Sequence, residues 1–206
     1  MINIIKSFRR REIGELLLSA FIIAFLFTIK SFLYTDLLDF LILLAIFFII
    51  LAPAFILHEI SHKIVAVKLG YIAFYSIYPS ALIWSILLTT LFPGSIIFAA
   101  TGAVNIVSLD GFYRKKDIEK ISAAGPIANI ILAIIFYILY KIVTFSGNSF
   151  NLSSIILRYS SSLNIQLALF NLLPFYPLDG SKIASSNLVS YVILFAVTLL
   201  ISFIVY

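Results

Sequence analysis

Long apolar runs separated by short polar segments dominate the chain. A helix needs about 20 mainly apolar residues to cross the hydrocarbon core of a bilayer. Several runs approach or exceed that length, and we expect each of them to form a transmembrane helix. They comprise residues 16–33, 40–69, 123–140, 159–178 and 188–206. The pattern therefore predicts an all-α polytopic membrane protein with about five transmembrane helices.

Residues 71–107 break this pattern. No charged residue lies between Lys68 and Asp110, but the segment does not divide into plain spans of sufficient length. Residues 71–80 are aromatic and extended in character, and residues 95–107 are rich in small and β-prone side chains. Unpaired strands are not tolerated against lipid. We therefore expect a re-entrant or interfacial element that contains a strand pair and either packs against protein or lines a wet cavity.

The composition supports this class of protein. Of the 206 residues, 63% are hydrophobic and 11% are charged, whereas soluble domains average about 25% charged residues. The length suits a single membrane-embedded domain over residues 1–206. The sequence contains no cysteine, which excludes disulfide bonds and cysteine-based zinc sites.

The net charge of +5 is distributed in a way that indicates membrane orientation and not nucleic-acid binding. Basic residues gather at 6–11 and at 114–120, beside apolar runs, and such clusters stay in the cytosol. We therefore expect a multi-pass protein of the cell membrane with a cytosolic N-terminus. The second span then brings residues 58–62 back to the cytosolic side, and the polar loop at 146–154 lies outside.

Both histidines of the chain lie in the sequence HEISH at residues 58–62. Side chains four residues apart share one face of a helix, so His58 and His62 suit two ligands of a tetrahedral zinc ion. Glu59 stands where the general base stands in H-E-x-x-H peptidases. The alternative is an ion pair of Glu59 with Lys63, which contributes only about 0.2–0.5 kcal/mol on an exposed helix. Ionisable groups at membrane depth are costly and are usually functional, which favours the metal site.

A zinc site of this kind needs a third protein ligand. Asp36 and Asp39 are expected on the opposite side of the membrane from the histidines, and Asp110 and Asp117 lie among cytosolic charges. Asp179 follows the fourth span as it returns to the cytosolic side, after two prolines that cannot continue a regular helix. The backbone can bend there and direct the carboxylate inward. From spacing alone, an ordinary Asp-Gly turn at the end of a span explains Asp179 equally well.

Three sequence blocks stand in a fixed order along the chain. They are HEISH at 58–62, AGPIAN at 124–129 and NLLPFYPLDG at 171–180. Together they resemble the site-2 protease family of intramembrane zinc metalloproteases, and the sparse extramembrane sequence is similar to its compact prokaryotic and archaeal members. The resemblance covers residues 40–182. The Gly-x-Gly β-type element of that family is not evident in residues 71–107.

The resemblance implies a zinc-dependent endopeptidase that hydrolyses a peptide bond within or near a transmembrane helix of a membrane-protein substrate in the lipid bilayer. It implies one zinc ion. By matching positions, the roles implied are His58, His62 and Asp179 as zinc ligands, Glu59 as catalytic base, and Asn171 and Asn129 as substrate-binding residues. A substrate helix must unwind before cleavage, and an edge strand within residues 95–107 is a candidate to pair with the extended chain.

Other functions are also compatible with the sequence. A metal-ion transporter or channel would use the same His and Asp ligands, and it would tolerate replacement of Glu59 by glutamine. A non-catalytic relative would bind membrane helices, but it would not need an intact Glu59 and ligand set. A different membrane metallopeptidase would need a helical third ligand, and the remaining glutamates, 12, 15 and 119, do not form a second ligand motif. The sequence leaves the oligomeric state open.

Overall fold

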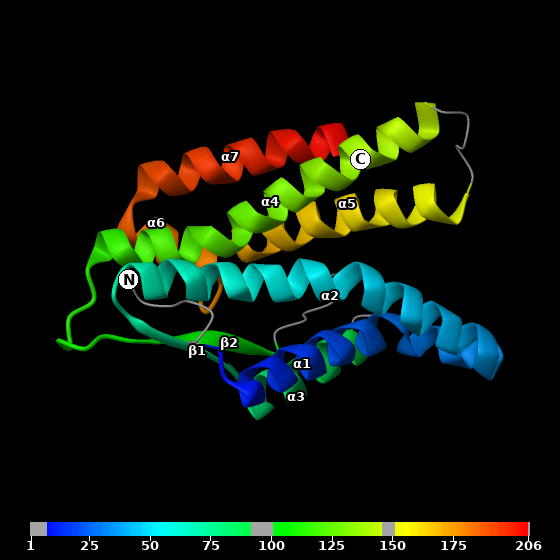
Figure 1. The fold of residues 1–206 in the computed structure, drawn as a ribbon, viewed down its shortest axis with the longest axis horizontal. Helices are drawn as coiled ribbons and strands as arrows, with labels where there is room; N and C mark the ends of the chain where they lie inside the picture. The colour runs from blue at the N-terminus through cyan, green and yellow to red at the C-terminus, as the bar shows by residue number, and fades with distance from the viewer. Residues whose placement is uncertain (1–7, 92–100, 146–150, 206) are drawn as a thin grey trace.

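The computed structural model describes residues 8–91, 101–145 and 151–205 of the chain. Helices predominate, and two short strands interrupt them (Figure 1). In chain order the elements are α1 (Arg10–Thr28), the 3-10 helix η2 (Ile29–Leu33), α2 (Leu37–Lys68), β1 (Ile72–Ile77), α3 (Pro79–Leu91), β2 (Gly102–Val107), α4 (Lys115–Phe145), α5 (Leu152–Asn171), α6 (Asp179–Ser186) and α7 (Leu188–Val205).

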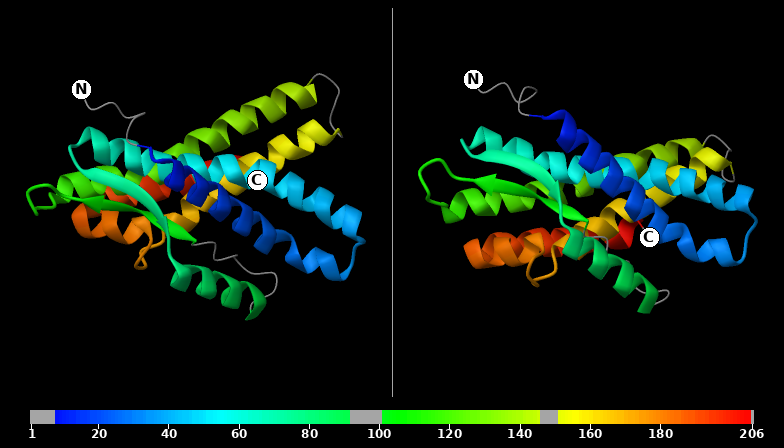
Figure 2. Two further views of the ribbon diagram at one scale, coloured as in Figure 1. Left: turned by 60° about the horizontal axis from the view of Figure 1, so that its bottom comes forward. Right: turned by 90° about the horizontal axis from the view of Figure 1, so that it is seen from below.

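Helix α2 runs through the middle of the molecule. Helices α4, α5 and α7 lie on one side of it, and α1, α3 and the two strands lie on the other side (Figures 1 and 2). α2 packs against α1, α4 and α5. A side chain on α2 can therefore meet groups from both halves of the molecule.

Helix α2 begins and ends where its sequence has helix-terminating signals. Asp36 caps the N-terminus by accepting a hydrogen bond from the Asp39 N–H at 2.8 Å, as short acidic side chains do at helix starts. The helix ends at Lys68, just before Gly70, whose φ of 91° is a conformation that favours glycine. The prediction of one continuous helix through the HEISH sequence is confirmed.

Four described segments are long and apolar enough to cross a membrane: Arg10–Leu33, Leu37–Lys68, Lys115–Phe145 and Leu188–Val205. The prediction of a membrane protein with several apolar helices is confirmed, but the count of about five spans is not. The segment predicted as the fourth span corresponds to α5, which contains serines, Asn164 and Gln166. α5 packs against α4, α7 and α2, so its buried polar side chains meet protein groups.

The predicted boundaries of the fourth span, 159–178, were wrong. α5 begins earlier, at Leu152, and ends at Asn171, three residues before Pro174. Proline lacks the N–H and clashes with the preceding turn, so a helix does not continue through Pro174 and Pro177. A further helix that the sequence did not predict, α6, begins at Asp179.

The strand pair expected within residues 71–107 is present. β1 and β2 form an antiparallel pair in which Ile72 lies opposite Val107 and Ile77 lies opposite Gly102. Helix α3, of 13 residues, follows β1 and is too short to cross a bilayer. The part of the predicted strand at residues 95–100 lies outside the described residues.

Helix α1 covers the outer edge of β1, so the sheet packs against protein as expected. The Tyr75 N–H donates to the Glu12 carboxylate at 3.0 Å, and the Ile77 N–H donates to the Glu15 carboxylate at 3.2 Å. These two side chains replace the neighbouring strand that β1 lacks on this edge.

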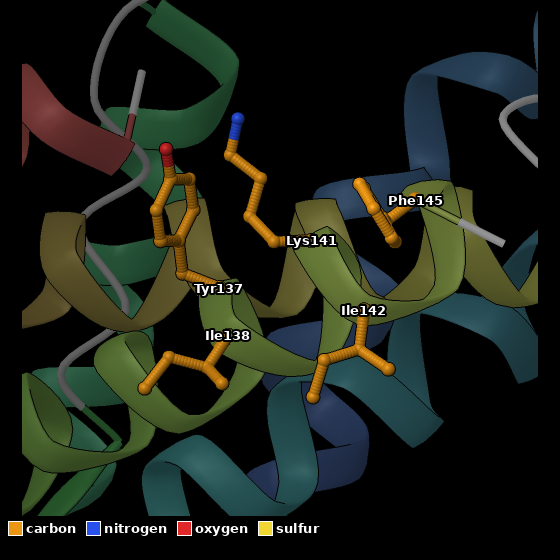
Figure 3. Close-up of a pocket in the computed structure, with 5 residues that line it drawn as sticks. All are labelled: Tyr137, Ile138, Lys141, Ile142 and Phe145. Carbon is orange, nitrogen blue, oxygen red and sulfur yellow. The ribbon is translucent and has the colours of Figure 1, made fainter.

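The far end of α4 has the character of a membrane–water interface. Figure 3 shows Tyr137 and Lys141 pointing the same way from α4, beside a shallow hollow that Ile138, Ile142 and Phe145 also line. The Lys141 ammonium lies 5.5 Å from the centre of the Tyr137 ring. Tyrosine and lysine are enriched where a helix leaves the hydrocarbon core. This hollow lies about 30 Å along α4 from Ile121, near which the candidate site forms.

Candidate metal centre

The two histidines of α2 face each other across one helical turn. Their ring centroids are 4.7 Å apart and their Nε2 atoms are 3.0 Å apart. His58 is 5% exposed and His62 is 7% exposed. Two buried imidazole nitrogens therefore point at one place inside the helical bundle.

Asp179 brings a carboxylate to the same place from a distant part of the chain. Its Oδ2 lies 3.3 Å from His58 Nε2 and 3.1 Å from His62 Nε2. Asp179 is the first residue of α6 and is buried. The start of α6 packs closely on the end of α5, since a Cβ at Gly180 would stand 2.6 Å from the Leu173 carbonyl oxygen. Glycine at 180 allows the turn that directs Asp179 inward.

The separations of these three ligand atoms fit a zinc ion. Tetrahedral zinc binds nitrogen and oxygen at about 2.0–2.2 Å, which places its ligands about 3.3–3.6 Å from one another. The observed values of 3.0–3.3 Å are close to that range. Within residues 8–91, 101–145 and 151–205, no other group of three or more metal-ligating side chains comes together.

Each histidine makes a hydrogen bond through Nδ1, on the side of the ring away from the site. His58 Nδ1 lies 2.6 Å from Asn129 Oδ1, and His62 Nδ1 lies 2.6 Å from the carbonyl oxygen of Ile121. A carbonyl oxygen only accepts, so His62 Nδ1 carries a proton, and the Nε2 of the neutral imidazole has the lone pair that a metal would bind. Ligands of zinc sites are commonly oriented by a hydrogen bond of this kind.

Gly125 provides the space in front of the two rings. A Cβ at this position would stand 2.6 Å from His58 Nε2 and would also collide with His62 Nε2. Gly125 lies on α4, within the AGPIAN block. No side chain at position 125 therefore stands between α4 and the two Nε2 atoms, as an ion between the three ligands requires.

Glu59 lies beside the ligands without being one of them. It is 9% exposed, and its carboxylate interacts with the backbone of Val104 in β2 and with the charges of Asp179 and Lys182. The predicted ligands and the predicted base therefore share one buried region where α2, α4, α6 and β2 meet.

The environment of Asn129 differs from that of a substrate-binding residue. It is fully buried behind His58. Both N–H groups of its amide are used, one donating to the Ala54 carbonyl at 3.0 Å and the other to Asn164 Oδ1 at 2.9 Å. Its oxygen faces His58. No donor remains for a substrate, so the geometry favours a role in orienting His58.

Asn171 is the last residue of α5 and is half-buried. Its amide donates to the Leu167 carbonyl of its own helix at 3.0 Å. The contact with the substrate implied for Asn171 by the resemblance stays a prediction.

Sequence reasoning missed the surroundings of the ligands. Asn164 was not selected, although an amide in the middle of a membrane-depth helix is a signal for an internal hydrogen bond. Lys63 was considered as an ion-pair partner of Glu59, but it is 1% exposed and its ammonium lies 2.5 Å from the Glu12 carboxylate. A lysine directly after a metal ligand gives no sign of its partner 51 residues earlier.

The other candidate acids lie away from the ligands. Asp36 caps the start of α2, about 33 Å along the helix from His58. The Asp110 carboxylate accepts from the Phe112 N–H at 3.0 Å, and the Asp117 carboxylate accepts from the Tyr71 hydroxyl at 3.0 Å. Of the acids weighed from the sequence as third ligand, Asp179 joins the histidines.

Fold and site together define the class: a membrane protein with a buried His-His-Asp centre of the H-E-x-x-H type. Over 180 residues, the chain is 35% identical to a protein of Methanocaldococcus jannaschii named "Putative zinc metalloprotease MJ0611". The match covers 87% of this chain and 86% of that relative. The chain belongs to the family of this zinc metalloprotease. No family model and no solved structure match the chain.

Proposed function

We propose that this chain is an intramembrane endopeptidase of the site-2 protease type, which binds one zinc ion and hydrolyses a peptide bond within or near a transmembrane helix of a membrane-protein substrate. One observation carries the proposal. Two imidazoles and a carboxylate from distant segments converge at zinc-like separations inside apolar helices, with Glu59 beside them, in a chain of a zinc metalloprotease family.

His58, His62 and Asp179 would hold the zinc ion, and Glu59 would act as general base and acid. A zinc ion held there supplies Lewis-acid polarisation of the scissile carbonyl and activation of a water molecule. The Glu59 carboxylate accepts the proton of the attacking water and passes it to the departing amine. Burial of Glu59 places this transfer in a region of low dielectric, where charge interactions are strong.

The edge of β2 that faces away from β1 is the proposed binding surface for the unwound substrate. The N–H groups of Tyr75 and Ile77 point away from β2, to Glu12 and Glu15. These residues pair with Val104 and Gly102, so Val104 and Gly102 also face away from the ladder, on the opposite edge. The Val104 backbone contacts Glu59. A peptide added at this edge would lie next to the base.

The orientation of the chain in the membrane is part of the same proposal. The start of α4, with its basic residues, lies at the same end of the molecule as HEISH, because the Ile121 carbonyl contacts His62. We place this end in the cytosol, with the N-terminus. Water for hydrolysis then enters from the cytosolic side.

The experiment that tests the function compares wild type with Glu59→Gln and Asp179→Ala. Glu59→Gln is expected to retain about one zinc per chain, and to lose cleavage of a single-span membrane protein by roughly 10²–10⁴-fold. Asp179→Ala is expected to lose both zinc and cleavage. Zinc content is measured by elemental analysis, and the fragments are identified by mass spectrometry.

The same variants separate the peptidase from a metal-ion transporter. A transporter would move zinc into liposomes and would tolerate Glu59→Gln. Zinc flux that persists in Glu59→Gln, together with no cleavage by wild type, would contradict the peptidase.

A further inference from the structure

We propose that Asn164 of α5 is a positioning residue of the metal centre. It holds the Asn129 amide, and through it the His58 imidazole, in the arrangement that aims a lone pair at the metal. The inference rests on the proposed function to the extent that His58 is a metal ligand. It concerns how the ligand is oriented and does not depend on which substrate is cleaved.

The orientation of the Asn164 amide follows from its partners. Asn164 is fully buried in the middle of α5. Its Nδ2 lies 2.8 Å from the Ser160 carbonyl oxygen. That oxygen can only accept, so the amide nitrogen must face it and the amide oxygen must face the other way. Asn164 Oδ1 then accepts from Asn129 Nδ2 at 2.9 Å.

Hydrogen bonds also fix the orientation of the Asn129 amide. One of its N–H groups donates to Asn164, and the other donates to the Ala54 carbonyl of α2 at 3.0 Å. The remaining polar atom, Oδ1, faces His58 Nδ1 at 2.6 Å. This oxygen only accepts, so Nδ1 must carry the imidazole proton. His58 Nε2 therefore keeps the lone pair that binds a metal.

The chain of contacts crosses three helices, from Ser160 and Asn164 on α5, through Asn129 on α4, to His58 on α2. Removal of the Asn164 side chain would leave one Asn129 N–H without its partner in the buried interior. The Asn129 NH2 group would then be held by Ala54 alone, and the amide would be freer to rotate away from His58. The proton on His58 could then move from Nδ1 to Nε2, and a protonated Nε2 cannot bind a metal.

Ser161 offers a matched control on the same helix. It is 1% exposed, and its hydroxyl donates to the Ala133 carbonyl of α4 at 2.7 Å. Replacement of Ser161 by alanine therefore removes a buried hydrogen bond between α5 and α4. The bond does not involve Asn129 or His58, so it tests packing without touching the ligand.

The experiment measures zinc affinity by competition with a chelator for wild type, Asn164→Ala, Asn164→Asp and Ser161→Ala. Asn164→Ala is expected to bind zinc about 10–100-fold more weakly, as for other groups that orient a metal ligand. Asn164→Asp is expected to restore most of the affinity, because a protonated carboxyl can donate to Ser160 and accept from Asn129. Ser161→Ala is expected to bind zinc like wild type.

Nitrogen NMR of the metal-free protein with isotope-labelled histidines provides a second readout. The chain has two histidines, so both tautomers can be assigned with the variant His62→Ala. Wild type is expected to show His58 protonated at Nδ1, beside Asn129 Oδ1, and Asn164→Ala is expected to show a larger population without the Nδ1 proton. The wild-type spectrum tests the proposal even if Asn164→Ala fails to fold.

Wild-type affinity in folded Asn164→Ala would overturn the proposal. An equal loss in Asn164→Ala, Asn164→Asp and Ser161→Ala would also overturn it, because the cause would then be loosened packing. A wild-type His58 without a proton on Nδ1 would do the same. None of these readouts needs peptidase activity, so a protein that shows the expected affinities but cleaves nothing would contradict the proposed function alone.

Discussion

At the scale of single residues, the metal centre depends on the absence of a side chain at Gly125 as well as on the ligand side chains. Gly125 lies against both rings, and a Cβ there would reach His58 Nε2 at 2.6 Å. Any other residue at this position of α4 would place its Cβ in the space between the ligands. The glycine of the AGPIAN block thus has a steric reason to be a glycine.

We therefore predict that Gly125→Ala loses zinc while the protein stays folded. Alanine is the better helix former by about 0.5–1 kcal/mol, so any loss of zinc arises from the collision and not from a weaker helix. Zinc content and thermal unfolding in detergent provide the measurement.

Gly14→Ala is the matched control for this prediction, since Gly14 also lies in a helix and a Cβ there meets no atom within 4 Å. It should keep its zinc. A Gly125→Ala protein that binds zinc with wild-type affinity would show that the rings are not as close to α4 as the structure has them.

The histidine ligands and the base could be predicted from the sequence, but the groups that orient the ligands could not. His58, Glu59 and His62 are recognisable because a helix fixes their relative positions through local spacing. Asp179 needed the resemblance, since its place depends on a bend 120 residues later in the chain. Asn164 and the Ile121 carbonyl depend on the packing of three helices, and no local spacing encodes that packing.

At the scale of elements, the sheet has a closed edge on β1 and a more open edge on β2, where the Tyr113 hydroxyl donates to the Ile106 carbonyl at 3.2 Å. Glu12 and Glu15 occupy the edge of β1, so an extended peptide has access to β2 only. The ladder bonds of β2 run through Ala103 and Asn105, which leaves the N–H groups of Val104 and Ile106 facing outward. The open edge lies on the side of Glu59.

We predict that proline at Val104 or at Ile106 lowers cleavage without removing zinc. Each substitution deletes one outward N–H and spares the ladder, so each should lower cleavage by about three- to tenfold, the value of one hydrogen bond. Alanine at the same positions keeps the N–H and is the control. The measurement is the initial rate of cleavage of a single-span protein at equal zinc content.

Ile106→Pro is the more informative of the two, because the Val104 backbone also contacts Glu59. Unchanged cleavage by Ile106→Pro and Val104→Pro would exclude the β2 edge as a binding surface.

Helices and strands could be predicted from the sequence where a long apolar run, or a break in such a run, determines the structure. The strand pair and α2 followed from such patterns. The end of α5 was misplaced because the apolar residues between Asn171 and Asp179 resemble a continuing span, whereas their prolines form a bend. The short helix α6 carries too few residues for a periodic pattern to be read.

At the scale of the whole molecule, the long helices separate the two ends of the protein by more than a bilayer core. α4 has 31 residues and is about 46 Å long, whereas the core is about 30 Å thick. Its basic first turn lies at the end of the metal centre, and the start of α5, with Ser153, lies at the other end. The two ends should therefore face different compartments.

We predict that Phe112→Cys and Ser153→Cys react with a membrane-impermeant maleimide from opposite sides. The chain has no cysteine, so each variant carries a single reactive thiol, and both positions are exposed. Ser153→Cys should be labelled in intact cells, and Phe112→Cys only in inside-out vesicles, because basic clusters stay in the cytosol. Labelling of both from one side would refute the membrane path of α4, and the reverse pattern would place the metal centre toward the outside.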